Sequence, residues 1–488
     1  MFIDYDTLLR TLSTVPPADV DGVTGVTHDS RRVEPGFVFV AVPGFKRDGL
    51  EFVTAALENG AALVVAERDV PGVSSLIVPD ARAALAALAC AGFGDPSEEM
   101  EVYGVTGTNG KTTTSYALYA ILAAAYGEGA VGLMTTAEVV VGGERRAAAH
   151  TTPEAVEVQR SLAEMRDAGA RRVVMEVSSH GIALQRVSGT KFSGVLFTNL
   201  TRDHLDLHGS MENYYTTKRE LFYRSTGSKL ANAESDYGRR LAEEAENVKT
   251  FGGVQEADYL VSDVRTTGRG TAFALETVSG RLSLEMPLLG PYNVLNVAGA
   301  AAFALDIGVE ESVVREAVTG MPQVPGRFER VAAASERGFE VIVDYAHTDV
   351  GLEAVLEVAR GVVAARGAGR VICVFGAAGE RDGAKRPLMG EVATRLADRG
   401  IITTDDAYGE DPAEIAAQVS AGTDGGLETV LDRREAIQLA LDDARAGDVV
   451  VVAGKGHERV QHLPDGDVPF HDASVVVDLL KEFERNGR

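Results

Sequence analysis

Short apolar runs alternate with alanine-rich amphipathic stretches from the start of the chain. Residues 36–44, 62–67 and 75–80 are rich in β-branched, aromatic and leucine side chains. Residues 52–61 and 81–93 carry instead the alanine and leucine content that is typical of helices. This alternation predicts a small domain that is built of βα units.

The composition changes at two places, which predict domain boundaries. Residues 94–99 have turn chemistry and few apolar side chains, and residues 319–327 hold prolines and glycines. We therefore expect three domains, residues 1–99, 100–325 and 326–488. The total length agrees with this division, because a domain usually has roughly 150 residues.

The remaining apolar runs predict parallel sheets. The second domain opens with a strand at Val102–Val105, and further strands are expected at Val173–Val177 and Val195–Thr198. In the third domain, strand-like runs alternate with helical stretches such as residues 351–365. Continuous apolar strands between helices are typical of a parallel sheet that is covered on both faces, so the expected fold class is α/β.

Charge and composition exclude several classes of protein. Hydrophobic residues make up 45% of the chain and charged residues 24%, as in ordinary globular proteins. The net charge of -25 argues against a nucleic-acid partner, which would need a basic face. No apolar run is long enough for a membrane span, and the N-terminus lacks the pattern of a signal peptide, so a cytoplasmic protein is expected. Cys90 and Cys373 lie in apolar surroundings and are expected to be buried thiols.

The strongest local motif is a loop rich in Gly and Thr between the strand at Val102–Val105 and the helix that follows. Its glycines allow backbone N–H groups to approach phosphate oxygens, and the helix N-terminus favours an anion. The spacing is GxxGKT and not the usual GxxxxGKT, so a glycine-rich turn that happens to contain a lysine is the alternative. The residues expected to bind nucleotide are Thr106, Gly107, Thr108, Asn109, Gly110, Lys111, Thr112 and Thr113.

Two further polar groups follow predicted strands. Glu176 ends one strand, and His204 lies shortly after another. Parallel sheets bind ligands at the carboxyl ends of their strands, so both side chains are expected to share a metal site with Thr112. Taken singly, each has a plainer interpretation, a solvated glutamate and a histidine that hydrogen-bonds locally.

Many longer segments resemble the Mur ligases of peptidoglycan assembly, and in particular the branch that adds the third residue of the peptide. The resemblance runs from about residue 20 to the C-terminus. The segments that carry it are GVTGTNGKTTT, HTTPEAVEVQ, MEVSSHG, FTNLTRDHLDLHGSMENYYTTKRELF, GPYNVLNVAGAAA, GRFERV, VDYAHT, GERDGAKRPLMG and AGKGHE.

The resemblance implies an N-terminal UDP-binding domain, a central ATPase domain and a C-terminal domain similar to a Rossmann fold. It also implies a two-step reaction with ATP and Mg²⁺. The γ-phosphate of ATP is transferred to the D-glutamyl carboxylate of UDP-N-acetylmuramoyl-L-Ala-D-Glu, and the amine of a free diamino acid attacks the acyl phosphate. A monomer is expected.

Individual residues match the family's functional positions. Lys218 matches a lysine that becomes a carbamate and binds the metal, although from the residues alone it is an ordinary helical lysine pairing with Glu220. The implied catalytic residues are Lys111, Glu176, His204 and Lys218, and the implied Mg²⁺ ligands are Thr112, Glu176, His204 and the Lys218 carbamate. The resemblance assigns His28 and Ser30 to uridine, Thr151, Thr152, Ser178 and Arg186 to the sugar–peptide, and Asn293, Arg327 and Asp344 to ATP. Residues 45–47 match the rest of the uridine loop.

The amino-acid pocket departs from the family pattern. Arg381, Gly454 and Glu458 match substrate contacts, but members that use meso-diaminopimelate carry Asp-Asn-Pro-Arg where this chain has Asp405, Asp406, Ala407 and Tyr408. Burying the distal carboxylate of meso-diaminopimelate without a cationic partner would cost free energy, so we expect the substrate to be L-lysine or L-ornithine. The alternative is meso-diaminopimelate, with Lys455 or Arg386 replacing the arginine.

Two other functions share parts of the pattern. A ligase similar to folylpolyglutamate synthase has a comparable phosphate loop, but it gives no reason for HTTPE or a UDP domain. A catalytically silent nucleotide-binding protein of the Mur type is the other alternative, and the intact Lys111, Glu176, His204 and Lys218 argue against it.

Overall fold

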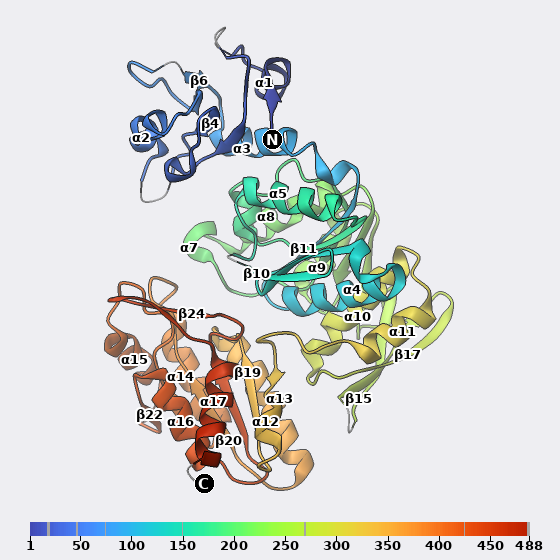
Figure 1. Ribbon diagram of the computed structural model, residues 1–488. Coiled ribbons are helices and arrows are strands. Elements are labelled where there is room, and N and C mark those ends of the chain that lie inside the picture. Colours follow the sequence, from blue (N-terminus) through green and yellow to red (C-terminus); the bar gives the residue numbers. More distant parts are fainter. Residues whose placement is uncertain are drawn as a thin grey trace. The chain divides into compact units, whose positions relative to one another are not determined.

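The computed structural model describes residues 1–16, 20–44, 47–73, 75–148, 150–267, 270–423 and 425–485. The chain divides into two compact units, which are coloured along the sequence in Figure 1. Unit 1 comprises Met1–Thr201, Ser210–Tyr259 and Gly299–Val314, and unit 2 comprises Arg202–Gly209, Leu260–Ala298 and Arg315–Arg488.

The N-terminal part of unit 1 is a parallel sheet in the order β3-β4-β5-β6, with β1 and β2 paired beside it. Side chains alternate along β4, so Val38 and Val40 pack with α1 and α3, whereas Phe39 packs with α2 on the other face. The predicted βα units are therefore present. The bounds are β1 (Ile3–Asp4), β2 (Gly22–Val23), β3 (Gly25–Thr27), β4 (Phe37–Val40), β5 (Leu63–Ala66), β6 (Ser75–Ile77), α1 (Tyr5–Leu12), α2 (Val53–Glu58) and α3 (Ala81–Gly92).

The second sheet of unit 1 has the order β10-β9-β8-β11-β7-β12-β13-β14. The strands from β8 to β14 run parallel, and β9 and β10 form an antiparallel edge. The bounds are β7 (Glu101–Thr106), β8 (Val131–Met134), β9 (Glu138–Val141), β10 (Glu144–Ala147), β11 (Arg172–Glu176), β12 (Phe192–Phe197), β13 (Ser228–Asn232) and β14 (Val248–Gly252). Because β11, β7 and β12 are parallel neighbours, their carboxyl ends meet at one edge of the sheet.

Helices connect these strands and bring polar residues to that edge. In α8, Tyr214, Lys218, Leu221 and Phe222 are buried at the spacing of one helical face. A lysine on this apolar face is thereby placed inside the unit. The helices of this part are α4 (Lys111–Tyr126), α5 (Ala155–Asp167), α6 (Ser179–Ala183), α8 (Met211–Arg224) and α9 (Asp236–Glu244). The residues of α10 (Pro291–Asp306) and α11 (Glu311–Gly320) are divided between the two units.

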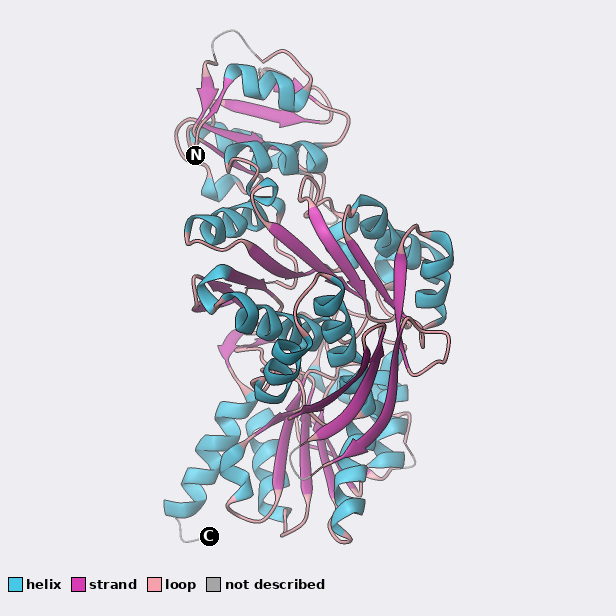
Figure 2. Ribbon diagram, turned by 90° about the vertical axis from the view of Figure 1, so that its right-hand side faces the viewer, coloured by secondary structure: helices cyan, strands magenta, loops and turns pink. Residues whose placement is uncertain are grey.

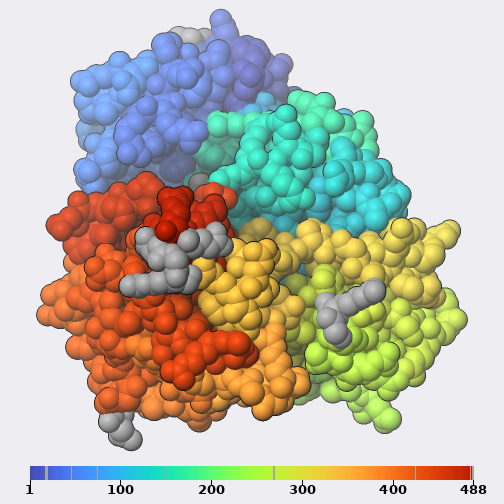
Figure 3. Space-filling model, turned by 60° about the horizontal axis from the view of Figure 1, so that its bottom comes forward, coloured from blue at the N-terminus to red at the C-terminus, as the bar shows by residue number. Residues whose placement is uncertain are grey.

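The C-terminal sheet of unit 2 has the order β18-β19-β23-β20-β21-β22 and is parallel except for β18. In β20, Cys373 and Phe375 pack against α13, α14 and α15, whereas Ile372 and Val374 pack against α16 and α17. Helices therefore cover both faces of this sheet, as the apolar strands predict, and Figure 2 shows its strands between helices. The same segment is coloured orange to red in Figure 3.

The bounds of these elements follow the sequence pattern closely. The predicted helix at residues 351–365 is α13, which Thr348 caps by accepting a hydrogen bond from the Gly351 N–H. The bounds are β18 (Glu329–Arg330), β19 (Glu340–Asp344), β20 (Val371–Phe375), β21 (Arg399–Ile402), β22 (Leu427–Thr429), β23 (Val449–Ala453), α12 (Ala332–Ser335), α13 (Asp349–Arg366), α14 (Lys385–Leu396), α15 (Pro412–Ser420), α16 (Arg433–Asp443) and α17 (Asp472–Arg485).

Unit 2 also contains antiparallel strands that the sequence pattern did not predict. β16 pairs with both β15 and β17, and β24 pairs with β25 in a short hairpin. The bounds are β15 (Tyr259–Thr266), β16 (Thr271–Thr277), β17 (Gly280–Met286), β24 (Val460–Leu463), β25 (Gly466–Pro469) and α7 (Leu205–His208).

Two simpler expectations concern thiols and membranes. Cys90 and Cys373 are buried and free, as predicted. Among the described residues, no helix combines the length and the apolar character that crossing a bilayer requires.

Candidate active site

The loop between β7 and α4 has a backbone that only glycine accommodates at two positions. Gly107 has φ 151° and Gly110 has φ 84°. A Cβ atom at Gly107 would lie 1.9 Å from Thr198 Oγ1. The loop therefore runs directly against the end of β12 and leads into the N-terminus of α4, as the phosphate-loop prediction requires.

The residues after β12 hold this loop in place. Thr198 Oγ1 donates to the Asn109 carbonyl at 2.6 Å, and the Thr108 N–H donates to the Asn199 carbonyl at 2.8 Å. The Asn109 N–H donates to Asn199 Oδ1 at 3.0 Å. The loop conformation is thus fixed by a neighbouring strand end, which preorganises its N–H groups for an anion.

Two lysines converge on the carbonyl of Gly107. Lys111 Nζ donates to it at 3.1 Å and to the Thr108 carbonyl at 2.8 Å. Lys218 Nζ donates to the same Gly107 carbonyl at 2.8 Å and lies 3.4 Å from Thr106 Oγ1. Lys218 is only 1% exposed. Lys218 therefore lies on the buried face of its helix, beside the phosphate loop.

Glu176 lies at the end of β11 with 0% exposure. The Thr136 N–H donates to its Oε1 at 3.1 Å, and Thr136 Oγ1 lies 3.2 Å from its Oε2 and 2.9 Å from Thr151 Oγ1. Thr112 is buried in the first turn of α4. The structure thus places Glu176, Thr112 and Lys218 in one unit, on elements that border the phosphate loop. Among the described residues, no cluster of three or more His, Cys, Asp or Glu side chains forms a metal site.

His204 belongs to unit 2, where it has φ 53°. Its N–H donates to Asp203 Oδ1 at 2.9 Å, and its Nε2 lies 3.4 Å from Asp203 Oδ2. The sharing of one metal ion by His204 and Glu176 stays a prediction.

The residues expected to bind the sugar–peptide gather beside Glu176. Thr152 Oγ1 donates to the Glu176 carbonyl at 3.1 Å and accepts the Ser178 N–H at 3.0 Å. Arg186 donates to the Thr152 carbonyl at 3.0 Å and pairs with Glu154 at 2.5 Å. Among the described residues, Arg186 Nε is buried without a hydrogen-bond partner. Arg186 therefore carries one buried N–H that no oxygen of the described residues satisfies.

His28 and Ser30 lie in the N-terminal part of unit 1, where Ser30 begins a short 3-10 helix after β3. The Ser30 carbonyl accepts a hydrogen bond from Asn59 Nδ2 at 2.9 Å. Within the described part of the chain, His28 Nδ1 is buried and lacks a hydrogen-bond partner. Residues 45 and 46, which match the rest of the uridine loop, lie outside the described residues.

Asn293, Arg327 and Asp344 occur together in unit 2. Asp344 accepts hydrogen bonds from the N–H groups of Phe328 at 2.6 Å and Ala346 at 2.8 Å. Burial raises the pKa of Asp344, and the positive charge of Arg327 opposes that shift. The Arg327 guanidinium lies over the ring of Tyr345, 4.3 Å from its centroid. Asn293 is buried in the first turn of α10 and donates to the Leu289 carbonyl at 2.8 Å.

The acids expected at the amino-acid pocket surround a buried lysine. Lys455, with 0% exposure, donates to Asp406 Oδ1 at 2.7 Å and to Glu458 Oε2 at 3.0 Å. Burial raises the pKa of Glu458 to about 7, although Lys455 opposes the shift. Among the described residues, Asp405 Oδ2 is buried without a hydrogen-bond partner. A Cβ at Gly454 would lie 2.1 Å from this oxygen, so Gly454 shapes the same pocket.

Arg386 and Lys455, the two cations that could replace the missing arginine, are both paired with acidic side chains. Arg386, only 3% exposed, binds Glu410 through two hydrogen bonds of 2.8 and 3.0 Å and Gln418 through a third. Lys455 is enclosed by Asp406 and Glu458 as described. Arg381 is exposed, and its guanidinium carbon lies 5.9 Å from the centroid of the Tyr408 ring.

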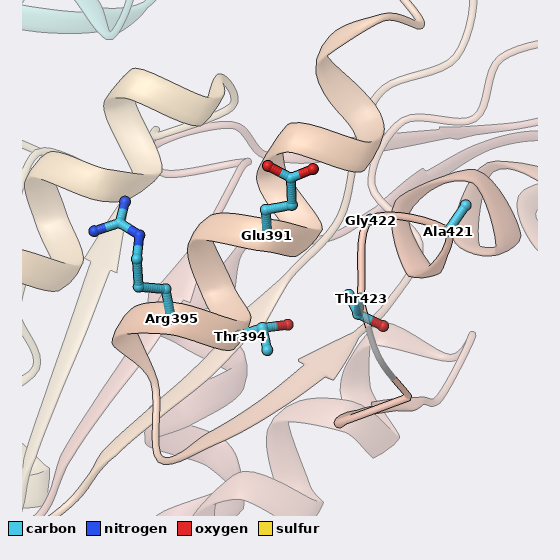
Figure 4. Close-up of a pocket in the computed structure, with 6 residues that line it drawn as sticks. All are labelled: Glu391, Thr394, Arg395, Ala421, Gly422 and Thr423. Atoms are coloured by element: carbon cyan, nitrogen blue, oxygen red, sulfur yellow. The ribbon is translucent and has the colours of Figure 1, made fainter.

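A hollow with a volume of about 360 Å³ lies elsewhere in unit 2, between α14 and the turn after α15 (Figure 4). Its lining residues are Glu391, Thr394, Arg395, Ala421, Gly422 and Thr423. None of the predicted site residues contributes to it, and Arg395 is paired with Glu353 at 2.5 Å. This hollow is not the predicted amino-acid pocket.

The sequence interpretation missed two residues of the site. Thr136, which holds Glu176, follows β8, and its position at a strand end was the available signal. His462, which stacks on Tyr408, lies in a hairpin whose position depends on tertiary contacts.

The phosphate loop, the buried lysines and the two α/β units define an ATP-dependent ligase of the type suggested by the motifs. Three family descriptions match the sequence: "Mur ligase family, catalytic domain" at residues 22–92, "Mur ligase middle domain" at 105–304 and "Mur ligase, glutamate ligase domain" at 326–456. The chain belongs to the Mur ligase family, with its three-domain architecture, and is an ATP-dependent, ADP-forming ligase of peptidoglycan synthesis.

Individual relatives match over nearly their whole length. The protein named UDP-N-acetylmuramoyl-L-alanyl-D-glutamate–2,6-diaminopimelate ligase from Syntrophomonas wolfei is 41% identical over 94% of this chain and 95% of its own. The protein of the same name from Gloeobacter violaceus is 40% identical over 99% of both. A solved structure of an enzyme with that name has a TM-score of 0.67 and 29% identity, over 99% of this chain and 100% of that one. The MurF ligase of Thermotoga maritima in complex with ADP, 21% identical over 94% of this chain and 98% of its own with a TM-score of 0.63, shares the fold.

Proposed function

We propose that the protein joins 2,6-diaminopimelate to the D-glutamyl carboxylate of UDP-N-acetylmuramoyl-L-Ala-D-Glu at the expense of ATP. The observation that carries the proposed chemistry is the convergence of Lys111 and the buried Lys218 on the Gly107 carbonyl, next to a preorganised phosphate loop. The names of the relatives support the choice of amino acid, since eight of them at 36–41% identity are all 2,6-diaminopimelate ligases.

In this proposal the loop N–H groups and Lys111 hold the β- and γ-phosphates of ATP. Thr112, Glu176 and a carbamate on Lys218 would hold Mg²⁺, which would supply positive charge to neutralise the phosphates during transfer. Asn293, Arg327 and Asp344 contact the rest of the nucleotide. Hydroxyl and carboxylate oxygens are the ligands that Mg²⁺ prefers, so this set suits the ion.

The carbamate forms when the neutral Lys218 amine attacks CO₂. The new N–C bond converts the cation into an anionic carboxylate, and the amine releases its proton to solvent. The structure supports this step in one respect: Lys218 is buried beside the phosphate loop, with its Nζ 2.8 Å from the Gly107 carbonyl, so a carboxylate formed there would lie next to the loop that binds the phosphates of ATP.

The substrate carboxylate is then positioned for phosphoryl transfer. We propose that Thr151, Thr152, Ser178 and Arg186 bind the sugar–peptide, with the buried Arg186 Nε–H as one donor, while His28 and Ser30 bind uridine. The carboxylate oxygen attacks the γ-phosphorus and ADP leaves. The amine of the diamino acid next attacks the acyl carbon through a tetrahedral intermediate, phosphate departs and the amine loses a proton.

The diamino acid is expected to bind in the amino-acid pocket of unit 2. We propose that Arg381 binds its α-carboxylate and that Asp405 and Glu458 attract its distal ammonium. Asp405 has a buried carboxylate oxygen without a hydrogen-bond partner among the described residues, and burial raises the pKa of Glu458, so both side chains would gain from a further positive charge. L-Lysine or L-ornithine, the amino acids expected from the sequence, remain the second candidate. The tyrosine at the arginine position favours them, since it removes the usual cation for a distal carboxylate.

The product mass tests this proposal. The enzyme is incubated with ATP, Mg²⁺ and UDP-N-acetylmuramoyl-L-Ala-D-Glu, together with meso-diaminopimelate, L-lysine or L-ornithine. We expect the mass of the UDP-N-acetylmuramoyl-tripeptide with meso-diaminopimelate, and a higher kcat/KM for meso-diaminopimelate than for L-lysine or L-ornithine. A higher kcat/KM with lysine or ornithine would support the second candidate, and no product with any of the three would refute the ligase function.

A further inference from the structure

The loop after β21 and the β24–β25 hairpin are joined at Tyr408. The Tyr408 N–H donates to the His462 carbonyl at 3.1 Å, and the His462 N–H donates to Asp406 Oδ1 at 2.9 Å. Gln461 Nε2 donates to the carbonyls of Thr404 at 3.1 Å and Asp405 at 3.2 Å. These hydrogen bonds fix the hairpin against the loop that carries the amino-acid pocket.

The side chains of Tyr408 and His462 are stacked. Their ring centroids are 5.1 Å apart and the ring planes differ by 12°. His462 Nδ1 lies 2.7 Å from Asp467 Oδ1 in β25. Because Nδ1 faces this carboxylate, Nε2 is the ring nitrogen that is left to contact a ligand.

The His462 side chain is partly exposed, so a ligand can reach its Nε2. Its side chain is 36% exposed, and within the described part of the chain its Nε2 has no hydrogen-bond partner. Tyr408 has φ 50°, a conformation that costs free energy in a non-glycine residue and is retained here by the bond to the hairpin.

The other cations near Tyr408 serve different partners. Arg386 is buried against Glu410, and Lys455 is buried between Asp406 and Glu458. Arg381 lies by the ring of Tyr408, and it is the residue proposed to bind the α-carboxylate. His462 is therefore the remaining basic group that contacts Tyr408 in the described structure.

We propose that His462, stacked on Tyr408, binds the distal carboxylate of the diamino acid and so determines specificity in place of the arginine. This inference rests on the proposed function. It gives each charged group of 2,6-diaminopimelate a partner, with Arg381 and His462 facing the two carboxylates and Asp405 and Glu458 facing the distal ammonium. The charged and titratable groups around His462 are Asp467, Asp406 and Tyr408.

The test compares kcat/KM for meso-diaminopimelate and for L-lysine in the full-length enzyme. The variants are His462→Gln, which removes the imidazole, and His462→Arg, which introduces a permanently charged guanidinium. His471→Gln is the matched control, because His471 lies outside the pocket and its Nδ1 contacts Ser474 at 2.8 Å.

We expect His462→Gln to lower kcat/KM for meso-diaminopimelate by about tenfold or more, chiefly through KM, as loss of one charged hydrogen bond implies. The value for L-lysine should stay within about twofold, since lysine lacks the distal carboxylate. His462→Arg should retain the preference for meso-diaminopimelate, and His471→Gln should change neither substrate.

The outcomes separate the inference from the proposed function. If wild-type enzyme prefers meso-diaminopimelate and His462→Gln keeps that preference, the role of His462 is refuted while the ligase proposal stands. An equal loss with both substrates would also refute it, because it would show a structural effect. A wild-type preference for L-lysine would overturn the inference together with the choice of amino acid, and inactivity with every amino acid would refute the proposed function itself.

Discussion

At the scale of single residues, the site depends on charged groups that the fold removes from water. Lys218 lies on the apolar face of α8, and Lys455 is enclosed by two carboxylates. Buried charges are costly unless they are paired or hydrogen-bonded, so Lys455 depends on its two carboxylates and Lys218 on the Gly107 carbonyl.

Replacement of Lys111 tests the phosphate loop. Lys111→Ala should lower kcat by a factor of about 10²–10³, the usual effect of removing one donor to developing negative charge. ADP release measures the rate, and a thermal melt should show an unchanged fold. Lys229→Ala is the control, since its ammonium only approaches the Glu246 carbonyl at 3.5 Å on the surface. Normal turnover by Lys111→Ala would refute the role of this loop.

Replacement of Lys218 tests the carbamate. Lys218→Ala should be nearly inactive, and millimolar formate or acetate should partly restore ligation by supplying a carboxylate to the metal. Because Lys218 is buried, a loss of activity alone would be ambiguous, and rescue distinguishes metal binding from folding. ¹³C NMR after addition of labelled bicarbonate provides the direct signal. Full activity of Lys218→Ala would exclude the carbamate.

The raised pKa of Glu458 predicts that folding stability and the KM for the diamino acid depend on pH. Its pKa is raised to about 7 by burial, above its ordinary value of 4.5. Its contribution to folding stability is therefore present below pH 4.5 and is lost as the pH rises through about 7. As the pH rises through about 7, Glu458 becomes ionised and can bind the distal ammonium of the diamino acid.

We expect the KM for the diamino acid to fall between about pH 6 and pH 8 in the wild type, as Glu458 ionises. Glu458→Gln should remove this change, whereas Glu414→Gln, an exposed change in α15, should keep it. Steady-state kinetics across this range measure the effect, and an identical pH profile for Glu458→Gln would contradict it.

At the scale of elements, strand ends place the chemistry. β7, β11 and β12 are parallel neighbours, so Thr106, Glu176 and Thr198 end at the same edge of the sheet. Thr198 and Asn199 then hold the phosphate loop through hydrogen bonds to Thr108 and Asn109. The loop conformation therefore depends on a second strand end as well as on its own glycines.

Gly107→Ala tests this dependence. The new methyl group would lie 1.9 Å from Thr198 Oγ1, on a backbone with φ 151°. Displacing the loop should cost about 1–3 kcal/mol and raise the KM for ATP. Gly129→Ala is the matched control, because nothing lies within 4 Å of its added Cβ. Equal ATP affinity in both variants would show that the loop is not constrained in this way.

Sequence patterns predicted the elements that have strong periodicity. The strands at Val102–Val105 and Val195–Thr198 and the helix at residues 351–365 are present, because apolar runs and helical faces are local signals. The β15–β17 strands and the β24–β25 hairpin were missed, since their pairing depends on long-range contacts. His462 was missed for the same reason.

At the scale of the whole molecule, the family assignment explains why one chain carries a nucleotide loop, a sugar–peptide site and an amino-acid pocket. The resemblance supplied Lys218, His28 and Arg186, which no local pattern singles out, and the structure then showed Lys218 to be buried beside the loop. The domain boundaries at residues 99 and 325, the cytoplasmic location and the monomeric state stay predictions.

In the proposed reaction the D-glutamyl carboxylate is activated as an acyl phosphate, and the transfer of its oxygen to phosphate tests this step. UDP-N-acetylmuramoyl-L-Ala-D-Glu is labelled with ¹⁸O in the reacting carboxylate and incubated with enzyme, ATP, Mg²⁺ and meso-diaminopimelate. We expect one ¹⁸O atom in the released phosphate for each peptide bond formed, measured by mass spectrometry. Phosphate without ¹⁸O, released alongside the ligated product, would contradict it.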